Sequence, residues 1–538
     1  MTLKMMNQLF AKKSLKVLLD EMAGEHRLKR VLGPVSLSAL GIGAIIGAGI
    51  FVSTGEAARN IAGPALMLSY VAAGVTCIFA ALCYAEFASM APVAGSAYTY
   101  AYTTLGELMA WIIGWDLVLE YAVGSATVAN GWSSYFQKIL GKLHLDLPAF
   151  LSGPPYTFDH NKGEFVINII KRTVDGHEVE VGQGFINLPA ILIVAIVTAV
   201  LVKGISESAG FNGLMVLIKL AAVLFVIVVG AFYIDPKNWT DNFAPHGYGG
   251  FSVFGIKELS TGWDEASQKP LGMLAGAAII FFAYIGFDSV STHAEEAKNP
   301  QRDVPIGIMT SLVICTVLYV AVVAVLTGMV PYYKIDEGAG VSSAFAEKGL
   351  HMAETIIATA GVAGITSVLL VMMLSGPRVF LAMARDGLVP KKFFADVHPV
   401  FRTPWKSTMA IGVFVALMAG LLPISALLEL ANIGTLFAFV IVCAAVLIMR
   451  KTNPDTPRPF RCPLVPIVPI LGIVCCLVLM LSLPVGNWLR LVVWLAIGLV
   501  IYFGYGRHHS ILGQELRREI SVHGVSPAGM PLDDTQKP

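Results

Sequence analysis

Apolar runs of about 20 residues recur along the whole chain, and they constrain its fold more than any other feature. They lie at 33–54, 64–89, 97–135, 186–203, 210–233 and 270–295, and then at 304–330, 353–385, 406–422, 426–449, 463–484 and 487–505. Helices of this length span a bilayer. The 538 residues are 56% hydrophobic and 14% charged, whereas soluble domains carry roughly 25% charged residues. We therefore expect an all-α membrane protein with about twelve transmembrane helices.

Basic residues gather in alternate loops of this pattern. If both termini lie on one side, the short loops there hold Lys203, Lys298 and Arg302 and the basic stretches 378–406 and 450–461, whereas the opposite short loops hold few. Positively charged loops stay in the cytoplasm. We therefore expect a multi-pass protein of the plasma or inner membrane with both termini cytoplasmic. The long polar segments 136–184 and 234–269 then lie outside.

The two ends of the chain are polar. We expect residues 1–32 to form a cytoplasmic amphipathic segment, because it is basic and has no apolar stretch typical of a cleaved signal peptide. Residues 507–538 are expected to form a cytoplasmic tail that begins as a short helix and continues as disordered chain. No soluble domain is expected, since the longest polar segment is too short to bury its own core.

The sequence contains no catalytic or metal-binding pattern. Six of the seven cysteines lie inside apolar runs, without metal-ligand spacing to histidine: Cys77, Cys83, Cys315, Cys443, Cys475 and Cys476. No set of nucleophile, base and orienting residue is recognisable. The formal net charge of +1 gives no attraction toward nucleic acid. We expect no enzyme activity, no metal, no cofactor and no nucleic-acid partner.

Glycines interrupt the first apolar run. The stretch GIGAIIGAGIFV (41–52) holds four of them in mid-span, and each glycine costs about 1 kcal/mol against alanine in a helix. One interpretation is close packing of two helices. The other is that Gly47-Ala48-Gly49 unwinds beside a cavity, so that freed N–H groups bind a carboxylate. A dinucleotide-binding loop does not fit, because no strand precedes the glycines.

The sixth run has a matching weak point. Gly286 lies among aromatic residues in FFAYIGFDSVSTHAEEAKNP (281–300), near mid-membrane. A break here frees the carbonyl groups of Phe282, Ala283 and Ile285 to accept hydrogen bonds from an ammonium group. Weak helices at the first position of each half are typical of inverted-repeat transporters with a midplane site.

Three stretches resemble a known family. GIGAIIGAGIF in the first run, the stretch from Tyr84 to Tyr121, and FFAYIGFDSVSTHAEEAKNPQRDVPIGI (281–308) are similar to the amino acid-polyamine-organocation transporters. Within that family, the sequence most resembles the bacterial relatives of the cationic amino acid transporters. The resemblance extends over nearly all of residues 30 to 505.

The resemblance implies a LeuT-type fold with a five-plus-five inverted repeat. Helices 1–5 would occupy 33–235, helices 6–10 would occupy 236–450, and helices 11 and 12 would occupy 451–506, with helices 1 and 6 interrupted. The backbone amides of 47–49 would bind the substrate carboxylate and freed carbonyls of helix 6 its ammonium group, with Phe282 as a gate. The implied substrate-binding residues are Ile46, Gly47, Ala48, Gly49, Phe282, Ala283 and Ile285.

Lys219 lies well inside the fifth apolar run. A central lysine costs roughly 2.5 to 3.5 kcal/mol on insertion scales, so its amine needs a partner. One interpretation is a snorkelling or structurally paired lysine. The other is a proton carrier, because burial disfavours the charged amine. By the resemblance, a lysine here replaces a sodium ion beside helices 1 and 8, where Thr366 and Ser367 are its expected neighbours.

Glu86, Asp116 and Glu120 lie in or near the second and third runs, where acidic side chains usually face the bundle interior or a cavity. Glu86 is at the inner end of helix 2, and we expect it to brace a loop or gate the pathway. Glu120 follows Asp116 by one helical turn on the same face. We expect Glu120 in the polar wall of the pathway, where it helps to tolerate a cationic side chain.

These features predict a secondary active transporter of L-amino acids, cationic or small neutral, that works by alternating access and is coupled to protons. Its expected partners are the amino acid, protons and the lipid bilayer. The sequence neither indicates nor excludes a small membrane subunit or a sterol-like lipid. Two alternatives remain open, namely an exchanger of amino acids or polyamines and a non-transporting amino acid sensor.

Overall fold

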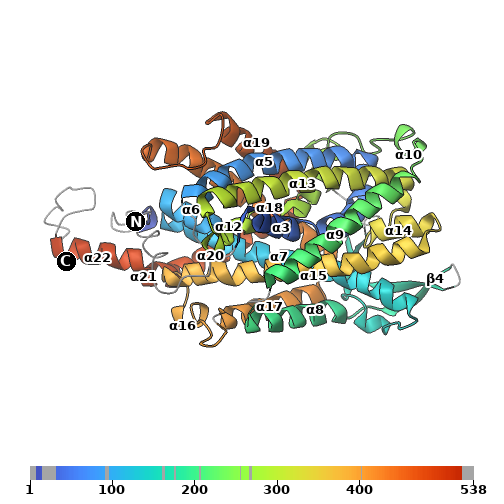
Figure 1. Ribbon diagram of the computed structural model, residues 1–538, viewed down its shortest axis with the longest axis horizontal. Helices are drawn as coiled ribbons and strands as arrows, with labels where there is room; N and C mark the ends of the chain where they lie inside the picture. The colour runs from blue at the N-terminus through green and yellow to red at the C-terminus, as the bar shows by residue number, and fades with distance from the viewer. Residues whose placement is uncertain are drawn as a thin grey trace.

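The computed structural model describes residues 8–14, 32–90, 96–159, 164–174, 177–204, 208–254, 256–265, 269–401 and 403–523. Long helices lie side by side and form an elongated bundle (Figure 1). The first described residues, 8–14, and the last helix, α22 (Ile511–His523), lie together at one end of the bundle, and strand β4 (His177–Gln183) lies at the other.

The first half begins with an interrupted helix. α3 (Pro34–Ile45) stops at Ile46, whose ψ of 106° is not helical, and the chain resumes as η1 (Gly49–Ser53), α4 (Thr54–Ala57) and η2 (Ala58–Ala62). The predicted break is present, but it lies at Ile46 and Gly47, and Ala48 and Gly49 of the predicted stretch 47–49 are already helical. After the short turn η3 (Gly63–Ala65) come four long helices, α5 (Leu66–Met90), α7 (Glu107–Lys142), α8 (Leu188–Lys203) and α9 (Ser208–Ala231).

The second half begins with another interrupted helix. α11 (Met273–Ile280) and η5 (Phe281–Tyr284) are followed by a non-helical Ile285 and by Gly286, which has a φ of +114°, before α12 (Ser289–Thr292) and η6 (Ala294–Glu296). The long helices that follow are α13 (Pro300–Met329), α15 (His351–Arg385), α17 (Trp405–Leu421), α18 (Ile424–Thr452), α19 (Ile467–Leu481) and α20 (Val485–Ile501). Short elements between them are η7 (Tyr332–Lys334), α14 (Gly340–Glu347) and α16 (Lys391–Phe394).

The prediction of one helix over 97–135 is wrong. α6 (Ser96–Thr104) is separated from α7 at Leu105 and Gly106, and Gly106 has a φ of +105°, which L residues rarely adopt. Hydropathy did not reveal the break, because apolar and aromatic residues continue on both sides of it. α7 also extends to Lys142, into the segment expected to be a loop.

The two long polar segments contain β-hairpins that were not predicted. Each sheet has two antiparallel strands, and exposed side chains prevail on β2 and β6, so no separate core forms. The pairs are β1 (Tyr156–Asp159) with β2 (Glu164–Ile167), β3 (Ile169–Val174) with β4 (His177–Gln183), β5 (Ser252–Val253) with β6 (Ile256–Ser260), and β7 (Trp263–Asp264) with β8 (Lys269–Pro270).

Within the described part of the chain, eight helical stretches are long and apolar enough to cross a membrane. They are Pro34–Met90, Glu107–Lys142, Gly213–Ala231, Met273–Thr292, Pro300–Met329, His351–Arg385, Ile424–Thr452 and Val485–His509. α8, α17 and α19 are shorter apolar helices of 10–17 residues. Outward faces are apolar too, since Leu214, Leu217, Leu224 and Val228 of α9 are each at least 51% exposed. The chain is a largely helical multi-pass membrane protein.

The chain ends are described in part. Of the segment 1–32, residues 8–14 and Leu32 are described, so its expected amphipathic character lies mostly outside the described residues. After α20 come η8 (Tyr502–Gly506), α21 (Arg507–His509) and α22 (Ile511–His523). The short helix predicted in the tail is therefore present, and the disorder expected after it falls on 524–538, outside the described residues.

Candidate functional site

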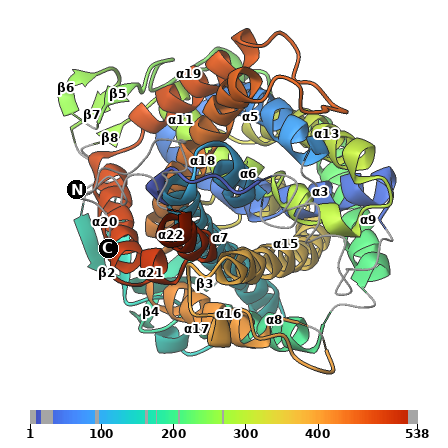
Figure 2. The same ribbon diagram turned by 90° about the vertical axis from the view of Figure 1, so that its left-hand side faces the viewer.

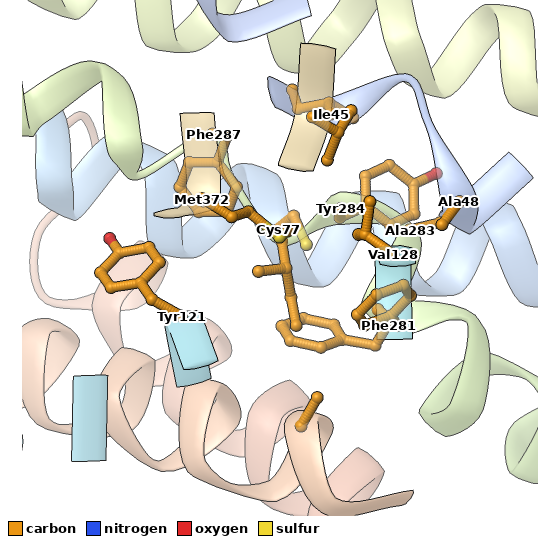
Figure 3. Close-up of a cluster of buried hydrophobic side chains, with 14 of the residues drawn as sticks. Ile45, Ala48, Cys77, Tyr121, Val128, Phe281, Ala283, Tyr284, Phe287 and Met372 are labelled. Atoms are coloured by element: carbon orange, nitrogen blue, oxygen red, sulfur yellow. The ribbon is translucent and has the colours of Figure 1, made fainter. Parts of the chain in front are cut away.

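The two interrupted helices meet at their breaks. A side chain at Gly49 would overlap the Cα atom of Ala283, and a Cβ atom at Gly286 would lie 3.1 Å from the carbonyl oxygen of Ala44. The glycines therefore allow the backbone of the first interrupted helix (α3–η1) to approach that of the second (η5–α12) directly. Figure 3 shows Ala48 beside Ala283 and Tyr284 in this region.

All seven residues predicted to bind substrate lie at this junction and are buried. Ile46, Gly47, Ala48 and Gly49 come from the first break, whereas Phe282, Ala283 and Ile285 come from the second, and Phe282 is 2% exposed. The structure thus brings together the two groups of residues that the sequence separates by more than 200 positions.

Three tyrosines that sequence reasoning missed join the two breaks. The hydroxyl of Tyr319, on α13, lies 2.7 Å from the carbonyl oxygen of Ile45 and 3.1 Å from that of Ala283. Tyr284 donates to the carbonyl of Tyr70 at 2.8 Å, and the Tyr70 hydroxyl lies 3.3 Å from the Gly49 carbonyl. A tyrosine inside an apolar run is the signal that points to such a role, because its hydroxyl needs a buried acceptor.

Lys219 reaches the first break from α9. Its Nζ atom donates to the carbonyl oxygens of Gly43 at 2.6 Å and Ile46 at 2.9 Å, and the residue is fully buried. These carbonyls are at the C-terminal end of α3, where the helix dipole presents partial negative charge. A cation at this position therefore stabilises the break. Helix α15 approaches closely as well, since a Cβ atom at Gly364 would lie 3.3 Å from that of Lys219.

Thr366 and Ser367 follow Gly364 on α15 by two and three residues. The Thr366 hydroxyl accepts a hydrogen bond of 2.9 Å from Nε1 of Trp132 on α7 and donates to the carbonyl of Val362. Ser367 is buried, and the next residue, Val368, packs on Gly47. The structure therefore places Thr366 against α7, while this part of α15 also contacts the first break.

Acidic side chains lie deep in the bundle on the other side of the junction. Asp116 and Glu120 are 1% and 2% exposed, and neither carboxyl has a hydrogen-bond partner among the described residues. Asp116 packs on Gly434 of α18, and the Thr435 hydroxyl lies beside Glu120. Asp288, just after the second break, accepts a hydrogen bond of 2.7 Å from Tyr121. Glu120 therefore lies close to two further carboxyl groups, those of Asp116 and Asp288, and its place in the wall of the pathway stays a prediction.

Glu86 lies away from the breaks and braces a loop. Its carboxylate accepts two hydrogen bonds from Arg450, at 2.8 and 2.7 Å, and one of 2.8 Å from the backbone N–H of Cys462. Nε of Arg458 lies 3.2 Å from Oε1. These contacts join α5 to the end of α18 and to the segment before α19.

The comparison with known protein families agrees with this geometry. The model of the amino acid permease family matches residues 32–504, which include both interrupted helices and every long helix. The chain belongs to this family, within the amino acid-polyamine-organocation superfamily, and so to a class of membrane transport proteins rather than enzymes.

Two bacterial relatives match this chain over their whole length, and a longer plant relative matches it in part. The branched-chain amino acid permease BcaP of Bacillus subtilis (strain 168) is 45% identical over 513 residues, which cover 95% of this chain and 100% of the relative. The methylthioribose transporter of the same organism is 43% identical over 509 residues, with the same coverage. The vacuolar cationic amino acid transporter 4 of Arabidopsis thaliana is 39% identical over 80% of this chain and 65% of the relative.

Proposed function

We propose that this protein carries L-amino acids across the plasma membrane by alternating access and that Lys219 couples the movement to protons. The observation that carries the proposal is the junction itself, where two helix breaks meet and a buried lysine amine contacts the carbonyls of Gly43 and Ile46. A zwitterion needs both a donor-rich and an acceptor-rich partner in a dry site, and two broken helices supply both.

The proposal includes the architecture implied by the resemblance. Residues 33–235 and 236–450 then form two inverted repeats of five helices each, and 451–506 form the last two helices. The corresponding positions of the two breaks, in α3–η1 and in η5–α12, support this division. The end that carries both chain ends would face the cytoplasm, because the basic loops gather there.

Side chains beside the junction favour a neutral aliphatic amino acid. In Figure 3, Val128 and Phe281 lie near Ala48 and Ala283, whereas Cys77 and Met372 lie farther from Ala48. None of these four buried side chains carries a charge. The name of the branched-chain relative agrees with this lining. The carboxyl groups of Glu120 and Asp288 are the features that favour a cationic amino acid instead.

Uptake into proteoliposomes tests the function. Radiolabelled leucine, alanine, arginine and methylthioribose are offered with and without an inward proton gradient. Each charge that moves across 100 mV contributes about 2.3 kcal/mol, so we expect accumulation of leucine or alanine only with the gradient. Uptake that needs only internal amino acid would indicate an exchanger, and binding without flux would indicate a sensor.

Lys219→Met tests the coupling, since methionine fills a similar volume without an amine. We expect gradient-driven accumulation to disappear, because methionine has no amine to take up and release a proton beside the carbonyls of Gly43 and Ile46. Lys237→Met, at an exposed lysine of α10 (Lys237–Thr240), is the matched control and keeps full uptake. Accumulation that survives in Lys219→Met under a proton gradient would show that coupling runs elsewhere.

A further inference from the structure

Residues 8–14 form a strap across the end of the bundle that carries both chain ends. The backbone N–H of Glu107 donates to the carbonyl of Ala11, and that of Lys13 donates to the carbonyl of Tyr102, both at 3.1 Å. These two bonds attach the strap to the junction of α6 and α7. Figure 2 views this end and shows α22 beside α7, with α6 above them and α15 to the right.

Two glycines make room for the strap. A side chain at Gly106 would lie 2.7 Å from backbone atoms of Phe10, and one at Gly513 would overlap the amide group of Gln8. At Gly106 the close atoms are backbone atoms, so a Cβ atom there would displace the strap, whereas at Gly513 it would push the amide group of Gln8 away from its partners. The sequence of α22 and of the α6–α7 junction is therefore adapted to a chain that passes between them.

Glu107 is the centre of the contact. Its side chain is fully buried at the start of α7, and its carboxylate accepts hydrogen bonds from Nε2 of Gln8 at 3.0 Å and from the hydroxyls of Tyr502 at 2.8 Å and Tyr102 at 3.1 Å. The Ser510 hydroxyl donates to it as well. A buried carboxylate is stable only when donors of this kind surround it.

Gln8 connects the two ends of the chain to each other. Its Nε2 atom also donates to the carbonyl of Arg507 at 2.8 Å, while its Oε1 atom accepts from Arg517 of α22 at 2.9 Å. The side chain is 5% exposed and uses both of its polar atoms. Removal of Gln8 therefore breaks the link between strap, α7 and the C-terminal helix in one step.

The end of α15 is held by the same strap. Nζ of Lys13 lies 2.8 Å from Oδ1 of Asp386, and the Tyr98 hydroxyl of α6 donates to Oδ2 at 2.7 Å. The backbone N–H of Ile511, the first residue of α22, donates to the carbonyl of Asp386 at 3.0 Å. α6, α7, α15 and α22 are thus tied together at one end of the bundle, by a chain that leads on to the first broken helix.

We propose that Glu107 is a positioning residue of the transport cycle, whose carboxylate fastens the strap and α22 over α7 and keeps this end of the pathway closed. The proposal rests on the proposed function, since alternating access requires each end of the pathway to open in turn. When this end opens, Gln8 and Ser510 leave the Glu107 carboxylate. The strap and the Glu107 cluster therefore set how often this end opens, whereas the helix breaks set what is bound.

Thiol labelling measures that opening without any substrate. Ser291→Cys places a reporter on α12, a fully buried position on the half of helix 6 that Figure 1 places toward the chain ends. A membrane-impermeant maleimide is applied to the full-length protein in vesicles from the side of the termini. In this background, Gln8→Ala and Glu107→Gln are compared with the unchanged strap. Protein without the reporter gives the background from native cysteines, six of which are buried.

We expect labelling at least about five-fold faster in either variant, because each loses at least one net hydrogen bond and one such bond shifts a population by about that factor. Asp396→Asn is the matched control. It changes an acid to an amide in the exposed Asp396–Lys406 pair, whose atoms lie 2.7 Å apart between α16 and α17, and it leaves the labelling rate unchanged.

The proposal is wrong if Gln8→Ala elutes like the wild-type protein and is labelled at the same rate. This outcome holds even if Glu107→Gln fails to fold. Equal acceleration by Asp396→Asn would also overturn it, because any lost polar contact at this end would then suffice. The labelling assay needs no substrate, so it is independent of the transport assay. If none of the compounds offered is transported, the proposed function is refuted, but the labelling result still tests the role of Glu107.

Discussion

The hydroxyl group of Tyr319 connects the two interrupted helices. It lies in the middle of an apolar helix, within 3.1 Å of a carbonyl on each of the two interrupted helices. Both carbonyls come from residues next to a break, where the regular helical acceptor pattern is lost. The hydroxyl thus compensates for a missing backbone hydrogen bond and holds the two breaks at one distance.

Tyr319→Phe removes this hydroxyl and keeps the ring. We expect the protein to lose about 1 to 3 kcal/mol of stability, because a buried carbonyl is left without its donor. Substrate affinity falls as well, since the breaks are no longer held together. Thermal unfolding in detergent and equilibrium substrate binding measure the two effects.

Tyr333→Phe is the control, since this tyrosine is 58% exposed outside the bundle. Equal stability losses in the two variants would mean that the Tyr319 hydroxyl has no special role. The sequence predicted the importance of Lys219 from its charge, but Tyr319 has no charge to attract notice. Its role depends on which carbonyls lie opposite, and this is a property of the packed structure.

At the scale of elements, the two interrupted helices depend on close backbone approach. Gly49 of η1 faces Ala283 of η5 with no room for a side chain. Helix propensity alone would favour alanine over glycine at such a position by about 1 kcal/mol. The close approach to Ala283 therefore explains why glycine is required.

Gly49→Ala should separate the two breaks and abolish transport while the rest of the bundle remains folded. The reason is that the methyl group would displace the backbone of Ala283. Uptake and the elution profile of the purified protein are the two measurements. Gly213→Ala is the matched control on α9, where a Cβ atom meets nothing within 4 Å, and it keeps uptake. Normal uptake by Gly49→Ala would show that the breaks need not touch.

Predictions from the sequence succeeded where one element carries its own signal. Glycines in mid-span indicated both breaks, because weak helix propensity is local. The boundary between α6 and α7 escaped prediction, since Gly106 is a single residue in an otherwise aromatic and apolar stretch. The hairpin β3–β4 escaped as well, because charged residues alternate with apolar ones in it and its apolar Ile169, Val179 and Val181 are exposed, so no buried face signals a strand.

At the scale of the whole molecule, Glu86 holds distant parts of the chain together. Arg450 and Cys462 bind its carboxylate, and Arg458 lies within ion-pair distance. Glu86 and Arg458 are both buried, at 2% and 8% exposure. Within the described part of the chain, both arginines therefore pair with this one carboxylate.

Glu86→Gln should destabilise the protein by about 3 to 5 kcal/mol, the range for breaking a buried ion pair. The amide loses the negative charge that both arginines need. A large fall in melting temperature is expected, and Arg450→Lys should show a smaller one, because lysine keeps the charge but forms one bond in place of two. A melting temperature that Glu86→Gln leaves unchanged would assign the arginines other partners.

The hairpin β3–β4 projects from the bundle at the end opposite the strap, as Figure 1 shows for β4. Its two strands pair with each other, so an antibody fragment raised against the hairpin would bind an ordered epitope. In electron microscopy the bound fragment would add mass outside the detergent that surrounds the helices, and this mass would help to align the particle images. The hairpin is thus a suitable binding site for an imaging antibody fragment, and it lies at a distance from the helix breaks.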